Sequence, residues 1–174
     1  MTSTTASPSP AAPSLRGPFR LAIGVLVAMA ATVLKGALTT STGSGMAYAD
    51  WPLSDGQVMP ESSYTTLPGF FEHFHRLAAA STGLLALALA VWLQFGFGRA
   101  VSARARATAW IGGCLILVQG VIGGLGVLKN TPALFSITHG TLAQLVFATF
   151  AWLAYQLTER HRTMRPVPEV APGT

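Results

Sequence analysis

The chain has 174 residues, of which 51% are hydrophobic and only 10% are charged. A soluble domain carries roughly a quarter charged residues, so this composition excludes an ordinary soluble fold. The net charge of +5 does not indicate nucleic-acid binding, because nearly all basic residues flank apolar segments, as in membrane proteins. A single cysteine, Cys114, excludes an intrachain disulfide, and its apolar surroundings predict a buried side chain.

Four apolar segments follow a tail over residues 1–18 that is rich in Ser, Thr, Pro and Ala and is predicted to be disordered. Each segment has about the 20 residues that a bilayer crossing needs. The segments cover residues 19–39, 70–97, 108–128 and 133–157. The sequence therefore predicts an all-α integral membrane four-helix bundle over 19–158, with an external loop over 40–69 and a tail over 159–174.

The orientation follows from the basic residues outside these segments. One side of the predicted bundle carries Arg16, Arg20, Arg99, Arg104, Arg106, Arg160, Arg162 and Arg165, whereas the other carries Lys129 alone. Since Lys and Arg gather in cytoplasmic loops, we predict that both termini are cytoplasmic, in the plasma membrane of a prokaryote. A signal peptide cleaved near Ala49 is the alternative; it is disfavoured because Lys35 and a polar stretch separate that position from the apolar run.

Two histidines lie inside predicted spans, where titratable residues are costly and therefore functional candidates. His75 and His139 lie about five and six residues into spans that start on the outer side, so both lie about 8 Å below the outer boundary. Two histidines at equal depth on facing helices predict a bis-histidine haem or metal site. For each histidine alone, an interfacial polar role is the alternative, and zinc is disfavoured because only Glu72 offers a further ligand.

Further polar residues surround the predicted site. Glu72 and Arg76 share a helix face with His75, whereas His73 is expected to point elsewhere. Arg76 is a candidate partner for a haem propionate, because Arg pairs well with carboxylates. Gln119 is expected to bond either across the bundle or to a ligand.

The third span is rich in glycine. It contains Gly112, Gly113, Gly120, Gly123 and Gly124. The spacing of Gly120 and Gly124 is typical of a surface on which membrane helices pack closely, so packing is the predicted role of these glycines.

A set of motifs resembles the haem A synthase family over about residues 35–147. The external loop reads T-G-S-G over 42–45 and D-W-P-L over 50–53, and the next helix opens with E-x-x-H-R over 72–76. The resemblance implies that His75 and His139 ligate haem iron and that Glu72 takes part in the chemistry. It also implies oxidation of a methyl group of haem O toward the formyl group of haem A, with haem b or haem O bound and an electron acceptor that the sequence does not identify.

The chain departs from the family in two ways. Tyr48 and Ser54 stand where many members have a cysteine pair, and typical members have eight helices in two halves, each with a histidine pair. A single half predicts a homo-oligomer or a second half-length partner. The resemblance favours a haem A synthase-like oxidoreductase. The alternatives are a b-type electron-transfer protein without chemistry on the macrocycle, and an assembly subunit without haem.

Overall fold

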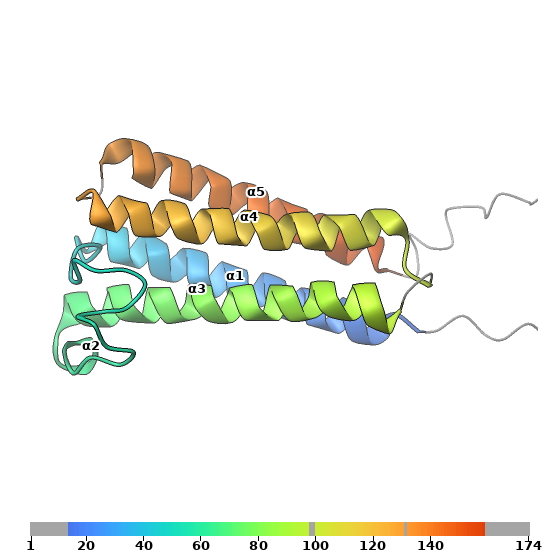
Figure 1. Ribbon diagram of the computed structural model, residues 1–174, viewed down its shortest axis with the longest axis horizontal. Helices are drawn as coiled ribbons and strands as arrows, with labels where there is room; N and C mark the ends of the chain where they lie inside the picture. The colour runs from blue at the N-terminus through green and yellow to red at the C-terminus, as the bar shows by residue number, and fades with distance from the viewer. Residues whose placement is uncertain (1–13, 98–99, 131, 159–174) are drawn as a thin grey trace, which may run out of the picture.

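Four long helices form the molecule (Figure 1). The computed structural model describes residues 14–97, 100–130 and 132–158. The helices are α1 (Arg16–Ser41), α3 (Leu67–Val91), α4 (Ala103–Leu128) and α5 (Ala133–Gln156), with a short α2 (Ser62–Thr65) in the external connection and a π-helical turn, η1 (Trp92–Gly96), that continues α3. All four long helices are long and apolar enough to cross a membrane. The predicted all-α architecture with four spans is therefore confirmed.

Local sequence explains where two of these helices begin. The Thr66 hydroxyl accepts a hydrogen bond from the Gly69 N–H at 3.2 Å, and the Ser102 hydroxyl accepts one from the Ala105 N–H at 3.1 Å. Such side-chain acceptors satisfy N–H groups that a helix start leaves unpaired. These helices consequently begin at Leu67 and Ala103, before the predicted starts at Phe70 and Thr108.

The helices pack in a ring. α1 contacts α3 and α5, and α4 also contacts α3 and α5, so that α3 and α5 occupy opposite corners of the bundle. Figure 1 shows that the described chain starts and finishes at one end, here called the terminal end, while residues 42–66 cover the other, the loop end. Four of the basic residues used for orientation (Arg99, Arg160, Arg162 and Arg165) lie outside the described residues, as do residues 1–13 of the first predicted tail and all of the second, 159–174. The cytoplasmic placement of the termini stays a prediction.

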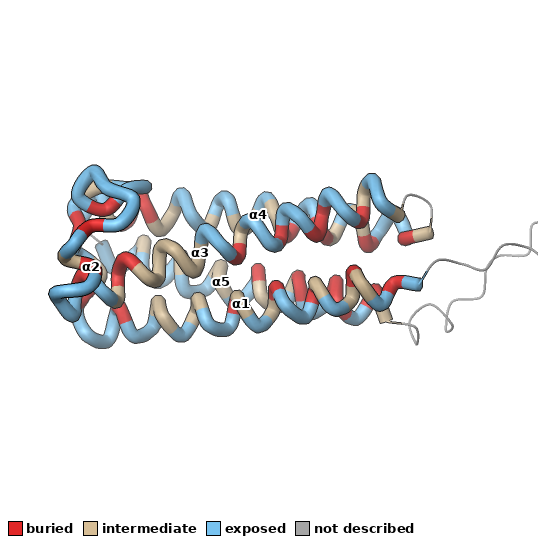
Figure 2. The backbone as a smooth tube through the Cα atoms, turned by 90° about the horizontal axis from the view of Figure 1, so that it is seen from below, coloured by how far each residue is buried: buried red, intermediate tan, exposed pale blue. Residues whose placement is uncertain are grey.

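The tightly packed core lies toward the terminal end. Its buried apolar residues fall mostly within 22–29 of α1, 86–93 of α3 and η1, 105–109 of α4 and 146–154 of α5. Toward the loop end, no residue is buried over 30–38, 74–81, 113–123 or 133–145 (Figure 2). Since protein interiors are normally close-packed, the loop half of the bundle is the part where a bound ligand can complete the packing.

The glycines of α4 serve different purposes. Gly112 lies against the buried ring of Phe150 in α5, which confirms close helix packing at this position, whereas Gly120 faces open space and Gly124 lies against Trp51 of the external loop. The expected packing of a second helix on Gly120 and Gly124 is therefore wrong within the described residues. The prediction of a buried Cys114 is also wrong: the side chain is exposed, because α4 buries the opposite face, which carries Ala109 and Gly112.

The close contact between Gly112 and Phe150 predicts that a larger residue at position 112 lowers the stability of the protein. A Cβ at position 112 would lie 2.5 Å from Cε2 of Phe150, whose ring is fully buried, whereas a Cβ at Gly113 meets nothing within 4 Å. We expect Gly112→Ala to lower the free energy of unfolding in detergent by about 1–3 kcal/mol through overpacking. Gly113→Ala is the matched control and should leave the free energy of unfolding unchanged or raise it by up to about 1 kcal/mol, because alanine is the better helix former. Equal effects of the two substitutions would contradict this account of the α4–α5 contact.

Candidate functional site

His75 of α3 is held by α1. Its Nδ1 lies 3.2 Å from the backbone oxygen of Thr32, and its ring rests against Gly36, where a Cβ would come within 2.9 Å of Cε1. A carbonyl oxygen can only accept, so Nδ1 of the neutral ring carries the proton and Nε2 presents a lone pair. This arrangement fixes the ring orientation and leaves Nε2 available as a metal ligand.

His139 of α5 is held by α4 in the same manner. Its Nδ1 lies 3.1 Å from the backbone oxygen of Gln119, and its ring rests against Gly123, where a Cβ would come within 2.8 Å of Cε1. The Gln119 amide also donates to the backbone oxygen of His139 at 2.8 Å. Nε2 of His139 is therefore also left with its lone pair.

The same pair of contacts holds each of the two histidines. In each case the accepting carbonyl and the supporting glycine are four residues apart on the neighbouring helix, Thr32 and Gly36 on α1 and Gln119 and Gly123 on α4. The contacts that α1 makes with His75 of α3 are thus repeated by α4 with His139 of α5. Because α3 and α5 occupy opposite corners of the bundle, the two neutral imidazoles come from opposite sides of the bundle.

The donor set fits a haem iron, which His75 and His139 would hold. Two neutral imidazoles whose second nitrogens bond to backbone carbonyls are the ligand type that haem proteins use. The Oε1 atom of Gln119, beside His139, is shielded from solvent and has no hydrogen-bond partner among the described residues, so a polar atom is left over at this place. The described residues contain no group of three or more His, Cys, Asp or Glu placed to hold a metal ion.

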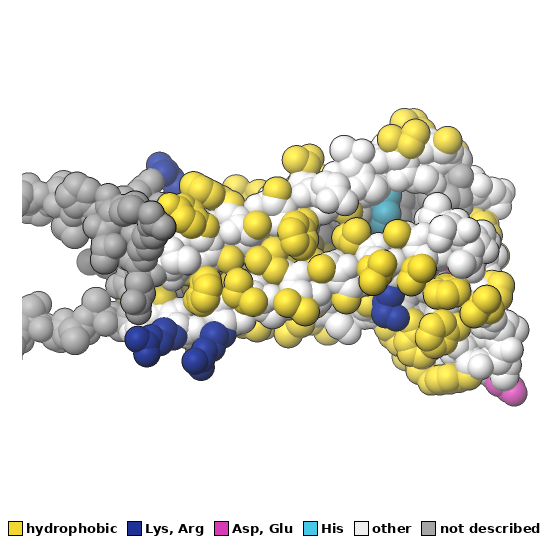
Figure 3. Space-filling view, turned by 180° about the vertical axis from the view of Figure 1, so that it is seen from behind, with side chains coloured by type: hydrophobic (Ala, Val, Ile, Leu, Met, Phe, Trp, Pro, Cys, Tyr) yellow, Lys and Arg dark blue, Asp and Glu magenta, His cyan; other side chains and the backbone are white. Residues whose placement is uncertain are grey.

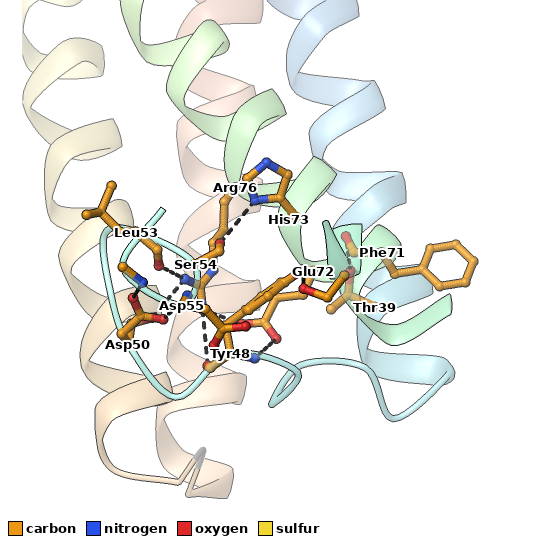
Figure 4. Close-up of polar contacts among 12 residues, drawn as sticks. Thr39, Tyr48, Asp50, Leu53, Ser54, Asp55, Phe71, Glu72, His73 and Arg76 are labelled. Carbon is orange, nitrogen blue, oxygen red and sulfur yellow. Dashed lines mark hydrogen bonds and ion pairs between the residues drawn. The ribbon is translucent and has the colours of Figure 1, made fainter. Parts of the chain in front are cut away.

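Glu72 and Arg76 contact the external loop instead. Glu72 is 3% exposed, accepts a hydrogen bond from the Tyr48 N–H at 3.1 Å, and forms an ion pair with Arg76 (Figure 4). Arg76 further donates to the backbone oxygens of Asp50, at 2.8 Å, and of Leu53. We call Tyr48, Glu72 and Arg76 the loop clamp, because together they fix the loop onto α3.

Helix geometry explains why the clamp and the histidine pair separate. Glu72, His73 and Arg76 span about 100° of the helix circumference, whereas His75 lies about 60° beyond Glu72 on the other side. The loop covers the first sector, and α1 covers the second. His75 therefore contacts α1 rather than the loop. Its three-residue spacing from Glu72 had predicted that the two side chains share a face.

His73 is a buried residue whose contacts sequence reasoning did not identify. It is 3% exposed; its Nδ1 lies 3.0 Å from the Ser54 hydroxyl and its Nε2 lies 3.0 Å from the Met59 sulfur. Its ring also meets that of Tyr48 edge to face at 6.2 Å. Tyr48 and Ser54 are thus both buried against His73. The three-residue spacing between His73 and Arg76 was the signal that both face the loop.

A tight turn shapes the loop that the clamp holds. Ser54 and Gln57 exchange backbone hydrogen bonds at 3.1 and 3.0 Å around Asp55 and Gly56, which have φ of 52° and 69°. Positive φ at both central residues is typical of a type I′ hairpin turn, for which Asp-Gly is a favoured sequence. The Asp50 carboxylate accepts the N–H groups of Asp55 at 2.9 Å and of Gly56 at 2.8 Å.

We expect this turn to loosen in acid. The Gly56 N–H, with those of Asp55 and Asp50 itself and the charge of Arg76, lowers the pKa of the Asp50 carboxyl below 3.8, against an opposing effect of desolvation. A folded-state pKa below the unfolded value means that the carboxylate stabilises the loop above pH 3.8 and loses this effect as the pH falls through the lower value. Hydrogen-exchange protection of the Asp55 and Gly56 amides should fall there. In Asp50→Asn this loss of protection in acid should be absent. An equal loss in the variant would mean that another titratable group causes it.

The structure thus defines a membrane-embedded four-helix bundle with a paired-histidine site near its loop end. A family model described as cytochrome oxidase assembly protein matches residues 19–172. Heme A synthases from Bacillus licheniformis, Alkalihalophilus pseudofirmus and Symbiobacterium thermophilum are 30%, 33% and 35% identical over 80%, 83% and 83% of this chain. The chain therefore belongs to this family, that of the haem A synthases.

The comparison also shows a difference in length. The matches cover 45%, 47% and 48% of those three relatives, so the chain spans about half the length of the curated relatives it matches. No solved structure matches the chain.

Proposed function

We propose that this chain binds haem between His75 and His139 and acts in haem A biosynthesis, as a membrane oxidoreductase that converts a methyl group of haem O toward the formyl group of haem A. The observation that carries the proposal is the pair of imidazoles whose Nδ1 atoms are both bonded to backbone carbonyls, at 3.2 and 3.1 Å, leaving two free Nε2 atoms. Membership in the haem A synthase family supports the same substrate.

The residues of the site have distinct proposed roles. His75 and His139 hold the iron of the bound haem, either haem O as substrate or haem b as cofactor, in the outer half of the membrane. Glu72, three residues before His75, would accept a proton during this oxidation, for which other molecules would supply the oxygen atom and take up two electrons at each hydroxylation. Arg76 pairs with a haem propionate, which requires it to exchange some of its bonds to loop carbonyls.

The described residues provide one bis-histidine site, so a functional unit with two haems takes a second four-helix unit. Membrane oligomers usually close with point-group symmetry, and we propose a homo-oligomer in the plasma membrane. Chemical crosslinking and mass measurement of the protein in nanodiscs tests this; a monomer at every concentration would contradict it.

The test of the activity is the identity of the bound haem. The full chain is expressed in a host that makes haem O and then purified, and its extracted haems are identified by chromatography and mass. We expect haem A or its hydroxylated precursor, absent from a Glu72→Gln control that retains a side chain able to accept the Tyr48 N–H. Recovery of haem O alone, unmodified, would contradict the proposed oxidation.

One observation favours a second candidate, a b-type electron-transfer protein. Both carboxylate oxygens of Glu72 are engaged, one by the Tyr48 N–H and the other by Arg76, so a structural role explains this residue without chemistry. Recovery of haem b alone, with wild-type spectra in Glu72→Gln, would favour this candidate. Recovery of no haem would overturn both proposals and leave an assembly role.

A further inference from the structure

A lysine lies within the first span without a charged partner. Lys35 is six residues before the end of α1 at Ser41, about 9 Å from the loop end of the helix. Its ammonium forms no ion pair and no hydrogen bond with the described residues, in contrast to the Arg76 guanidinium. Figure 3 shows basic atoms among hydrophobic side chains toward the loop end, apart from the basic side chains at the terminal end. Because a charge inside a span is costly, we expect Lys35 to have a partner outside the described chain.

Two phenylalanines of α3 form a platform for the Lys35 ammonium. Its Nζ lies 5.8 Å from the ring centroids of both Phe70 and Phe74, and these two centroids are 4.8 Å apart. Tyr64 of α2 meets Phe74 edge to face at 6.1 Å, and its hydroxyl has no hydrogen-bond partner among the described residues. The ring faces attract the cation but leave its N–H donors available to an anion. We call Lys35, Tyr64, Phe70 and Phe74 the Lys35 site.

The Lys35 site lies at the level where lipid headgroups begin. α3 and η1 together form a span of 30 residues, Leu67–Gly96, which is about 45 Å long. The hydrocarbon core of a bilayer is about 30 Å thick, so a centred span of this length extends about 7 Å beyond the core at each end. Phe70 and Phe74 lie about 5 and 10 Å past Leu67 along the helix, on either side of this boundary. The ammonium over their rings is therefore at the depth of a lipid phosphate.

Charge and surroundings identify the occupant as a lipid with a negative headgroup. On α1, the neighbours Leu34 and Leu38 are 62% and 39% exposed, so the surface beside the cation is apolar. A free phosphate ion would leave this surface uncovered, whereas the acyl chains of a phospholipid cover it. A zwitterionic headgroup carries a cation of its own, so an anionic headgroup compensates the charge of Lys35 better.

We propose that the Lys35 site binds the phosphate of one anionic phospholipid in the leaflet at the loop end. The Lys35 ammonium and the Tyr64 hydroxyl donate to the phosphate, while Phe70 and Phe74 hold the ammonium in place. Because these residues belong to α1, α2 and α3, the lipid joins three elements, including the helix pair whose contact positions His75. The inference does not depend on bound haem.

The test compares two lipids with the same acyl chains, dioleoylphosphatidylglycerol and dioleoylphosphatidylcholine. The purified full chain in a neutral detergent is titrated with each lipid, and bound lipid is counted by native mass spectrometry. The wild type should bind the anionic lipid more tightly. Lys35→Gln should weaken that binding about fivefold, the effect of one basic residue near an anionic lipid surface, and should leave binding of phosphatidylcholine unchanged.

Three further variants separate the Lys35 site from general attraction. Lys129→Gln removes the same charge at the C-cap of α4, also at the loop end, and is the matched control that should retain wild-type affinity. Lys35→Arg keeps a cation over the rings and should retain the preference. Tyr64→Phe keeps the ring and should weaken binding of the anionic lipid about threefold, within the range of one hydrogen bond. Helical circular dichroism checks folding, and Lys35→Met replaces Lys35→Gln if the latter does not fold.

Each contrary outcome has a definite meaning. Equal affinity of the wild type for the two lipids would overturn the inference, and unchanged binding in Lys35→Gln would assign any preference to the basic residues at the terminal end. An equal loss in Lys129→Gln would show that only net charge matters and would overturn it as well. Displacement of the lipid by inorganic phosphate would show that the site takes a free ion. None of these measurements involves haem, so their failure would leave the proposed function unaffected.

Discussion

Replacing His75 with alanine should weaken haem binding by at least about 100-fold. Loss of residues that only orient a metal ligand already costs up to about that factor, and this substitution removes the ligand itself. It also removes the hydrogen bond from Nδ1 of His75 to the Thr32 carbonyl, which joins α3 to α1 at 3.2 Å. The measurement is a titration with haem b in nanodiscs, followed by absorption spectroscopy, which also reports loss of bis-histidine ligation.

A neighbouring histidine provides the matched control. His73 is two residues away on the same helix, is 3% exposed, and points to Ser54 and Met59 of the loop rather than into the bundle. His73→Ala should therefore retain bis-histidine spectra and haem affinity within about threefold, a small change on the scale of the ligand loss, although it should destabilise the loop. Equal losses in both variants would mean that haem binding depends on the loop, and they would overturn the assignment of His75 as a ligand.

Much of the fold was predictable from composition alone. In a bilayer every backbone polar group must be paired within its own segment, so a run of apolar residues has to be a helix. Local sequence therefore determines the four spans, and the structure changes only their ends, such as the start of α1 at Arg16 and of α4 at Ala103. The expected depth of His75 and His139 rests on the same counting; because α3 begins at Leu67 rather than near Phe70, His75 lies eight residues past the start of its helix rather than five, whereas His139 lies six past the start of α5.

The immediate surroundings of the site were not predictable in this way. The carbonyl and glycine that hold each histidine lie on another helix, and their repeat in the two helix pairs leaves no sequence similarity beyond a glycine and a histidine. The contacts of Glu72 and Arg76 depend on the path of the external loop, which its distant contacts determine. One loop feature was accessible: Asp55-Gly56 is a favoured type I′ sequence and predicts the turn that the structure contains.

Replacing Arg76 with alanine should be the most destabilising change in the loop clamp. The ion pair is nearly buried, with side-chain exposures of 13% for Arg76 and 4% for Glu72. Removal of Arg76 leaves the Glu72 charge in place without its partner, and breaking a buried pair in this way costs about 3–5 kcal/mol. The loop also loses the donors to the backbone oxygens of Asp50 and Leu53. Unfolding in a detergent series, with hydrogen exchange at the Tyr48 amide, measures both effects.

Arg76→Lys separates charge from geometry. An ammonium group keeps the charge opposite Glu72 but lacks the planar fork that reaches several acceptors at once, so we expect an intermediate loss of stability and partial protection of the Tyr48 amide. A lysine variant as unstable as the alanine variant would show that the hydrogen bonds to the loop, rather than the charge, hold the clamp together.

The clamp also determines how any loss of activity at Glu72 must be interpreted. Glu72→Gln removes the charge opposite Arg76 and is expected to loosen the loop, so absence of product alone does not establish a chemical role. The comparison with Arg76→Lys resolves this, because that variant loosens the same loop while keeping the carboxylate. If Glu72→Gln loses conversion of haem O and Arg76→Lys retains it at equal loss of Tyr48 protection, the carboxylate acts in the reaction. If conversion follows loop protection in both variants, Glu72 is a positioning residue, and the proton acceptor lies elsewhere.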